Sequence, residues 1–264
     1  MTPILLTTGD LVLAGGLIAG CIVVSVMLSL GIHRTLAIAA VRMAAQLILT
    51  GSVLVFVFGK SSIWLTLLVV AFMFAAASCE VGSRQLVRLT PGWHFGIGGV
   101  STAAGTSVVV LVGLLTALQP HPWYQARTAI PMTGLLLGNV MNATSLSMNT
   151  LLSSVVGERA AIEARIILGA TRAAAMNSLI RRAIRTALIP TLNQMAAAGI
   201  VTLPGIMTGQ ILAGMNPLEA SKYQIVLMSL IVTGNMIGAV LSAGLTAARL
   251  SDARGRLRLE HLRA

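Results

Sequence analysis

The sequence has little charge, few acidic residues, few aromatic residues and only two cysteines. Charged residues occupy 9% of the 264 positions, whereas soluble domains carry roughly a quarter. Apolar residues occupy 56%, and the mean hydropathy is +0.90. This balance excludes an ordinary soluble domain and indicates an all-α, polytopic membrane protein.

Several missing motifs exclude common kinds of chemistry. Cys21 and Cys79 both lie inside apolar runs, so neither a disulfide nor a thiolate metal site is expected. The four histidines are scattered without H-x-x-x-H or H-E-x-x-H spacing, and no G-x-x-x-x-G-K-[ST] phosphate loop is present. We therefore expect no catalytic residues and no cofactor in this chain, which fits a transport subunit rather than an enzyme.

The net charge of +11 does not indicate nucleic-acid binding. Only ten residues are aromatic, and no basic motif is interleaved with them. The basic residues instead fall between apolar runs, where they orient membrane spans. We therefore expect contact with membrane lipid and none with nucleic acid.

Seven apolar runs are long enough to cross about 30 Å of hydrocarbon. They lie near 9–31, 36–58, 62–80, 97–118, 130–156, 188–213 and 224–248. Fourteen of the eighteen Lys and Arg residues fall on one side of the alternating spans, and three fall on the other. The positive-inside rule then places the N-terminus outside and the C-terminus inside. We expect one permease domain over 1–264, with a cytoplasmic segment at 158–187 and a basic cytoplasmic tail at 249–264.

The stretch from Glu158 to Pro190 carries six arginines and an apolar stripe at helical spacing. Gly169 interrupts the stripe and Thr171 is a suitable N-cap, so two short helices with a tight turn are expected. One interpretation is an amphipathic connection on the membrane surface. The other is a docking element that fits a groove on a separate soluble subunit.

Arg42 and Gln46 lie one helical turn apart in the second run and share a face. An intramembrane charge normally points into a bundle or a cavity, although Arg42 is close enough to the inner surface to snorkel. Glu80 ends the third run, where it could neutralise Arg42, bind a cation or cap the helix. All three residues are pathway candidates.

The fifth run is the most polar, with Asn139, Asn142 and several small residues. Met141 and Met148 offer thioethers that suit soft metals, although methionine in an apolar chain is more often packing. The polar stripe favours a pore lining, and these four residues are further pathway candidates. No metal ligand can be assigned.

The sixth run contains Pro204 and Gly205, which are expected to break or kink its helix. A broken span often marks a pathway, so both residues are candidates too. Glycines four apart predict close helix packing in four runs. These pairs are Gly16 with Gly20, Gly134 with Gly138, Gly205 with Gly209, and Gly234 with Gly238.

The sequence Glu163-Ala164-Arg165, followed by Gly169-Ala170-Thr171, resembles the EAA-type loop that ABC-transporter permeases insert into their ATPase subunits. The resemblance implies that Glu163, Gly169, Ala170 and Thr171 couple the chain to an ATPase. Arg165 departs from the importer pattern, which counts against importer membership and leaves the docking role.

A second resemblance covers nearly the whole chain. The segments LPGIMTGQILAGMNPLEASKYQI at 203–225, LGAT at 168–171 and RRAIRTALIPT at 181–191, with the Arg42/Gln46 pair, are similar to the FetB family of ABC permeases. That family includes bacterial iron exporters and plant permeases linked to aluminium tolerance. The resemblance implies two permease chains with two copies of a FetA-like ATPase, which binds ATP and Mg, at the bacterial inner membrane. It further implies iron export in metal homeostasis and oxidative stress resistance.

Three alternatives stay open on the residues alone. The chain could be an ATP-independent secondary transporter or channel, with Glu80 or Arg42 as the coupling residue. Such coupling generally uses intramembrane acids, of which the chain has almost none. It could also be an ABC permease for a non-metal substrate, or a membrane subunit that only anchors an ATPase.

Overall fold

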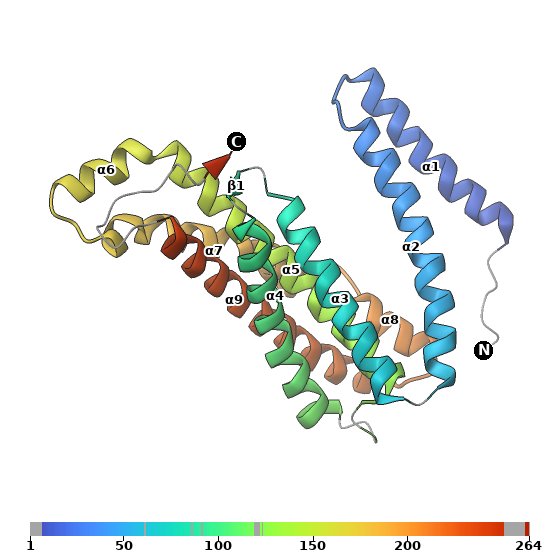
Figure 1. Ribbon diagram of the computed structural model, residues 1–264. Helices are drawn as coiled ribbons and strands as arrows, with labels where there is room; N and C mark the ends of the chain where they lie inside the picture. Colours follow the sequence, from blue (N-terminus) through green and yellow to red (C-terminus); the bar gives the residue numbers. More distant parts are fainter. Residues whose placement is uncertain are drawn as a thin grey trace. The chain divides into compact units, whose positions relative to one another are not determined.

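The protein is described by a computed structural model for residues 7–60, 62–85, 87–90, 92–118, 122, 124–250 and 262–263. Its elements, shown in Figure 1, are α1 (Thr8–Met27), α2 (His33–Gly59), α3 (Ile63–Ser83), β1 (Arg88–Leu89), α4 (Trp93–Val112), the π-helical η1 (Gly113–Leu118), α5 (Ala126–Gly157), α6 (Arg159–Ile167), α7 (Arg172–Ala197), α8 (Gly205–Leu212), α9 (Pro217–Arg249) and β2 (Leu262–Arg263). The predicted all-α membrane class is confirmed. The chain forms two compact units, Met1–Ser62 and Ile63–Ala264.

The N-terminal unit is a hairpin of α1 and α2. Thr7 caps α1, with its hydroxyl 3.4 Å from the Asp10 amide, while the Asp10 carboxylate accepts from the Thr7 amide at 2.8 Å. Nearly all of the apolar side chains on both helices are exposed within the chain. Because hydrocarbon is as apolar as these side chains, this surface suits lipid.

The C-terminal unit is a bundle in which α5 is central, since it packs against α3, α4, α7 and α9. At 32 residues, α5 is about 48 Å long and exceeds the hydrocarbon thickness. Arg84, just past the end of α3, bonds Asn142 halfway along α5. The remaining half of α5 therefore extends beyond the end of α3, toward α6.

Two apolar clusters lie at opposite ends of α5. The first joins the C-terminal half of α5 to α6, α7 and the end of α9, with members including Leu151, Leu152, Ile162, Met176, Leu179 and Leu250. The second joins the N-terminal half of α5 to η1 and the first half of α9, with members including Leu114, Met132, Leu136, Met228 and Ile231. Between the clusters, α4, α5 and α9 meet through glycine, serine and threonine.

Glycines allow the closest approach of α4 to α9. A Cβ built on Gly105 would lie 2.8 Å from the Gly234 carbonyl oxygen, and one on Gly238 would lie 2.8 Å from Val140 Cγ1. The predicted close packing is therefore confirmed for Gly234 and Gly238. A Cβ on Gly134 would lie 3.1 Å from Met73 Cε. The remaining members of the predicted pairs, Gly16, Gly20, Gly138, Gly205 and Gly209, have open space around them.

Six of the seven predicted spans correspond to single helices. Within the described residues, seven helices have 20 or more residues, and five of them are also apolar enough to cross a membrane by composition: α1, α2, α3, α4 with the start of η1, and α9. Helices α5 and α7 are long enough but carry more polar or charged residues. The ring centroid of Trp93 lies 4.2 Å from Arg249 Cζ. The start of α4 and the end of α9, which are both predicted to be cytoplasmic, are therefore neighbours.

The predicted helix boundary near 188 is wrong, whereas the expected break of the sixth run at Pro204 and Gly205 is confirmed. Helix α7 begins at Arg172 and continues through Pro190 to Ala197, and α8 is a separate helix of eight residues. The amphipathic stripe of the charged stretch therefore runs directly into the apolar run that follows it. Gly199, with φ +83°, and Pro204 then separate α7 from α8.

The predicted basic tail at 249–264 lies mostly outside the described residues. Of its described part, Arg249 ends α9, and Leu262–Arg263 pairs antiparallel with Arg88–Leu89. The predicted membrane orientation and single permease domain stay predictions.

Replacing Gly105 with alanine is expected to destabilise the bundle by about 1–3 kcal/mol, because the new methyl group overlaps the α9 backbone. Gly96→Ala is the matched control, since Gly96 lies in the same helix with nothing within 4 Å of a built Cβ. Thermal unfolding in detergent measures both. Equal midpoints for the two variants would contradict this packing.

Candidate functional site

The turn between α6 and α7 is set by glycine and threonine. Gly169 has φ +91°, which ends α6 in the left-handed conformation, and the Ala170 amide donates to the Arg165 carbonyl at 3.0 Å. Thr171 then caps α7 by accepting from the Ala174 amide at 3.3 Å. The predicted helix–turn–helix is confirmed. Its second helix is longer than predicted because α7 has 26 residues.

The α6–α7 hairpin is attached to the bundle through both packing and charge. Ile162 is buried with Met176 and Leu179 in the first apolar cluster. Arg182 of α7 pairs with Glu158 at the end of α5. Packing on one face and a link at the base give the hairpin a defined position on the bundle.

Arg165, the residue that departs from the importer pattern, braces the hairpin internally. Its guanidinium donates to the Ala175 carbonyl and to the Ser178 hydroxyl, each at 3.2 Å. Both contacts cross from α6 to α7. The arginine thus fixes the angle between the two helices.

The tip of the hairpin presents two large apolar side chains outward. Ile167 is 84% exposed and Leu168 is 86% exposed, immediately before Gly169. Glu163 lies on the same helix, paired with Arg159 at 2.8 Å and partly exposed. An exposed apolar tip with polar flanks is typical of a surface that binds another protein.

A cavity of about 110 Å³, lined by both polar and apolar side chains, lies between α5, α7 and α9. Two predicted pathway residues, Asn139 and Asn142, line it. The other lining residues are Ala143, Leu146, Ala187, Pro190, Thr191, Gln194 and Asn235. We call this site the amide groove, because four of its side chains are amides.

Two hydrogen bonds set the amide orientations in the groove. Asn235 is only 2% exposed, its Nδ2 donates to the Thr191 hydroxyl at 2.7 Å, and its Oδ1 has no hydrogen-bond partner. Asn139 donates its Nδ2 to the Leu135 carbonyl at 2.8 Å, one turn earlier in α5. Each amide nitrogen therefore donates one of its two N–H groups to the protein.

Pro190 leaves one backbone carbonyl of α7 without its usual donor. In an unbroken helix, each backbone carbonyl accepts a hydrogen bond from the amide four residues later in the chain. Proline has no amide hydrogen and cannot donate this bond. The Thr186 carbonyl thus lacks its usual helical donor. Pro190 therefore lies in the interior of α7 and is one of the residues that line the groove.

The edge of the groove carries an ion pair. Glu80 accepts from Arg84 Nε at 3.1 Å, and Arg84 Nη1 donates to Asn142 Oδ1 at 3.0 Å. Glu80 thus neutralises the arginine four residues ahead of it. The pair leaves the edge without net charge.

The polar stripe predicted along α5 is divided between different surroundings. Asn139 and Asn142 line the groove, whereas Ser145 accepts from Gln85, and Ser147 donates to the Ala239 carbonyl at 3.0 Å. The stripe thus serves both the groove and helix packing.

The methionines do not converge on one point. Met148 is fully buried in the first apolar cluster, Met141 packs against it, and Met132 belongs to the second cluster. Among the described residues, no group of three or more His, Cys, Asp and Glu could hold a metal.

The other predicted pathway residues lie elsewhere. Arg42 and Gln46 share an exposed face of α2 in the N-terminal unit. Pro204 is the N-cap of α8 and Gly205 its first residue. Neither Pro204 nor Gly205 is among the residues that line the groove.

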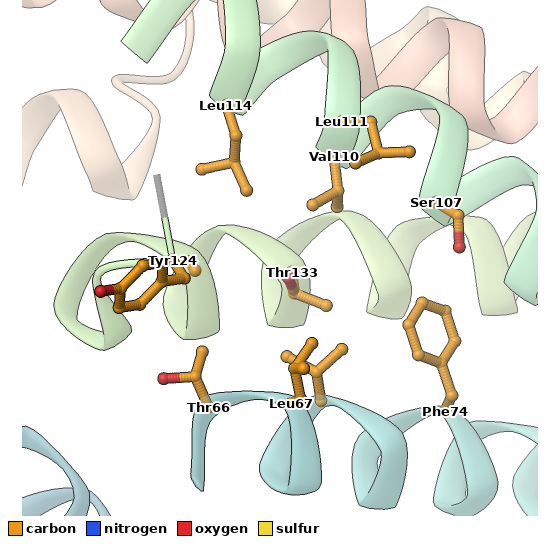
Figure 2. A pocket seen from close by; sticks show the side chains of 11 residues that line it. Thr66, Leu67, Phe74, Ser107, Val110, Leu111, Leu114, Tyr124 and Thr133 are labelled. Atoms are coloured by element: carbon orange, nitrogen blue, oxygen red, sulfur yellow. The ribbon is translucent and has the colours of Figure 1, made fainter. Parts of the chain in front are cut away.

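A second, larger cavity of about 280 Å³ lies between α3, η1, α4 and α5 (Figure 2). Its lining is mainly apolar, with Leu67, Phe74, Val110 and Leu114 around Thr66, Tyr124 and Thr133. Such a lining offers fewer polar groups than the amide groove, and none of them is an amide. The amide groove is therefore the better candidate for a polar substrate.

Sequence reasoning missed Thr191, Gln194 and Asn235 in this site. Asn235 is an amide in the middle of the apolar run of α9, which was a usable signal for a buried functional residue. Thr191 and Gln194 were hidden because the run containing them was expected to form a different helix.

Comparisons with known proteins give a consistent family. Over 199 residues the chain is 40% identical to a UPF0014 membrane protein of Synechocystis, covering 75% of this chain and 76% of that protein. It is 31% identical over 258 residues to the Escherichia coli protein named probable iron export permease protein FetB, covering 98% and 97%. It is 33% identical over 201 residues to protein ALUMINUM SENSITIVE 3 of Arabidopsis thaliana, covering 76% and 71%.

No solved structure matches the chain significantly. The family described as uncharacterised protein family UPF0014 matches residues 8–250, which is most of the sequence. With this match, its long apolar helices and its permease relative, the chain is an integral membrane protein that belongs to the UPF0014 family.

Proposed function

We propose that this chain is the membrane permease subunit of an ABC transporter and exports iron. Two copies would work with two copies of a FetA-like ATPase, which supplies the ATP and Mg chemistry, at the inner membrane. Export of iron would serve metal homeostasis and oxidative stress resistance. The permease relative from Escherichia coli supports the iron assignment through its name.

The observation that carries the coupling proposal is the α6–α7 hairpin. Ile167 and Leu168 are exposed at its tip, while its base is fixed to the bundle by Ile162, Met176 and the Glu158–Arg182 pair. A fixed base with an exposed apolar tip suits insertion into a groove on another protein. The EAA-like residues Glu163, Gly169, Ala170 and Thr171 belong to the same hairpin.

The amide groove is the proposed part of the translocation pathway in this chain. Asn142 and Gln194 are exposed on the bundle surface, and such amides are unfavourable against lipid. A second permease chain or an aqueous passage on this side would satisfy them. ATP-driven closure of the ATPases would move the hairpin and open the groove to one side at a time.

Leu168→Asp is expected to abolish binding of the ATPase, because it places a charge in the apolar contact. Leu218→Asp is the matched control, since Leu218 is also exposed but lies at the opposite predicted side of the membrane. Copurification of the ATPase with each tagged variant measures binding. If both variants lose ATPase binding equally, or if neither loses it, the docking role of the tip is contradicted.

Gly169→Val and Glu163→Lys are expected to retain the folded bundle but lose coupling. Valine at φ +91° strains the turn, and lysine reverses the charge that pairs with Arg159. In proteoliposomes, iron transport per ATP hydrolysed should fall at least about tenfold. Full transport by both variants would refute this coupling scheme.

The first test of the whole proposal is copurification of the tagged chain from its host, followed by an ATPase assay with and without iron. A copurifying ATPase stimulated by iron supports the proposal. Transport in proteoliposomes without nucleotide would instead identify a secondary transporter.

A further inference from the structure

We infer that the amide groove is a cation-binding site built from neutral oxygen ligands, with Asn235 Oδ1 at its base. This inference rests on the proposed transport of a metal and identifies where a hard cation binds. The candidate ligands are the side-chain oxygens of Asn235, Asn139 and Gln194.

Asn235 and Asn139 can offer the groove an oxygen acceptor, whereas the Asn142 oxygen already accepts from Arg84. Asn235 and Asn139 each donate their amide nitrogen to the protein, at 2.7 Å and 2.8 Å. These bonds fix the amide planes and leave both oxygens as acceptors for a ligand, beside the second N–H of each nitrogen. Since Asn235 Oδ1 is buried without a partner, it has a free-energy cost that a cation or a strong donor would relieve.

The type of ligand atom in the groove determines which kind of cation it suits. Amide, hydroxyl and carbonyl oxygens are hard ligands, which suit hard cations better than soft ones. No thiol, thioether or imidazole is among the lining residues. The groove therefore favours a hard divalent cation such as Fe²⁺ or Mn²⁺ over Cu⁺.

The charge at the edge of the groove and the volume of the groove are both compatible with a cation. The Glu80–Arg84 pair leaves the edge neutral, so a cation entering there meets no net repulsion from these two residues. A water molecule occupies about 30 Å³ in the liquid, so about 110 Å³ holds a cation with a few of its waters. A bulky organic solute would not fit without widening the groove.

The test is Mn²⁺ binding to the full chain in a non-ionic detergent, with the purification tag removed. The electron paramagnetic resonance signal of free Mn²⁺ reports binding as a loss of amplitude. Asn235→Asp adds a negative charge at the base of the groove and should tighten Mn²⁺ binding at least about tenfold. Asn235→Leu removes the oxygen and should weaken it by a similar factor.

Gln194→Glu gives a second test at an exposed position, where folding is less at risk. It should tighten Mn²⁺ binding by about threefold, since the added charge is partly screened by water. Asn193→Asp is the matched control, because Asn193 is an exposed amide on α7 outside the lining of the groove. Its affinity should stay within about twofold of the wild type.

Tightening by Asn235→Asp and Gln194→Glu, without a change in Asn193→Asp, supports the site. Unchanged or weaker binding in both charged groove variants overturns it, as does equal tightening in the control. Failure of the ATPase to copurify would defeat the proposed function and leave a measured Mn²⁺ site standing. Normal ATPase coupling with no effect of the groove variants on Mn²⁺ would defeat this inference alone.

Discussion

Hydrocarbon offers no hydrogen-bond partner, and this constraint explains why most polar side chains of α5 lie between helices. The outer faces of α1, α2 and α3 carry apolar residues, which need no partner there. The polar residues of α5 turn toward α4, α7 and α9, where Gly105 and Gly234 bring the backbones close. In the amide groove this arrangement leaves Asn235 Oδ1 without a donor, as it does several other buried oxygens, including those of Gln85 and Thr144.

The sequence predicted helices more reliably than it predicted how polar residues are shared between them. The Gly169 turn and Thr171 cap follow from local chemistry, so the hairpin could be predicted residue by residue. The extent of α7 could not be predicted in this way. The sequence changes from amphipathic to apolar near 188, which suggested a helix boundary, but α7 continues to Ala197. The groove also depends on tertiary pairing: Thr191 and Asn235 are 44 positions apart and meet only through the packing of α7 on α9.

The groove and the hairpin use different physical means for different partners. The hairpin presents apolar side chains, for which burial against protein is favourable over a broad contact. The groove presents neutral oxygens, which bind a cation more weakly than carboxylates would and so favour its release. A permease needs that weakness, because a substrate held too tightly cannot leave on the other side.

The continuity of α7 has a mechanical consequence. One helix carries both the cap at Thr171 and the groove residue Thr191, which are about 30 Å apart along its axis. A tilt of about 10° pivoting near Thr191 would displace the hairpin end by about 5 Å. Pro190 is the residue inside α7 that weakens the backbone ladder, and it lies next to this pivot. Bending at Pro190 would change the separation of Thr191 from Asn235. The size of the amide groove would then depend on the position of the hairpin.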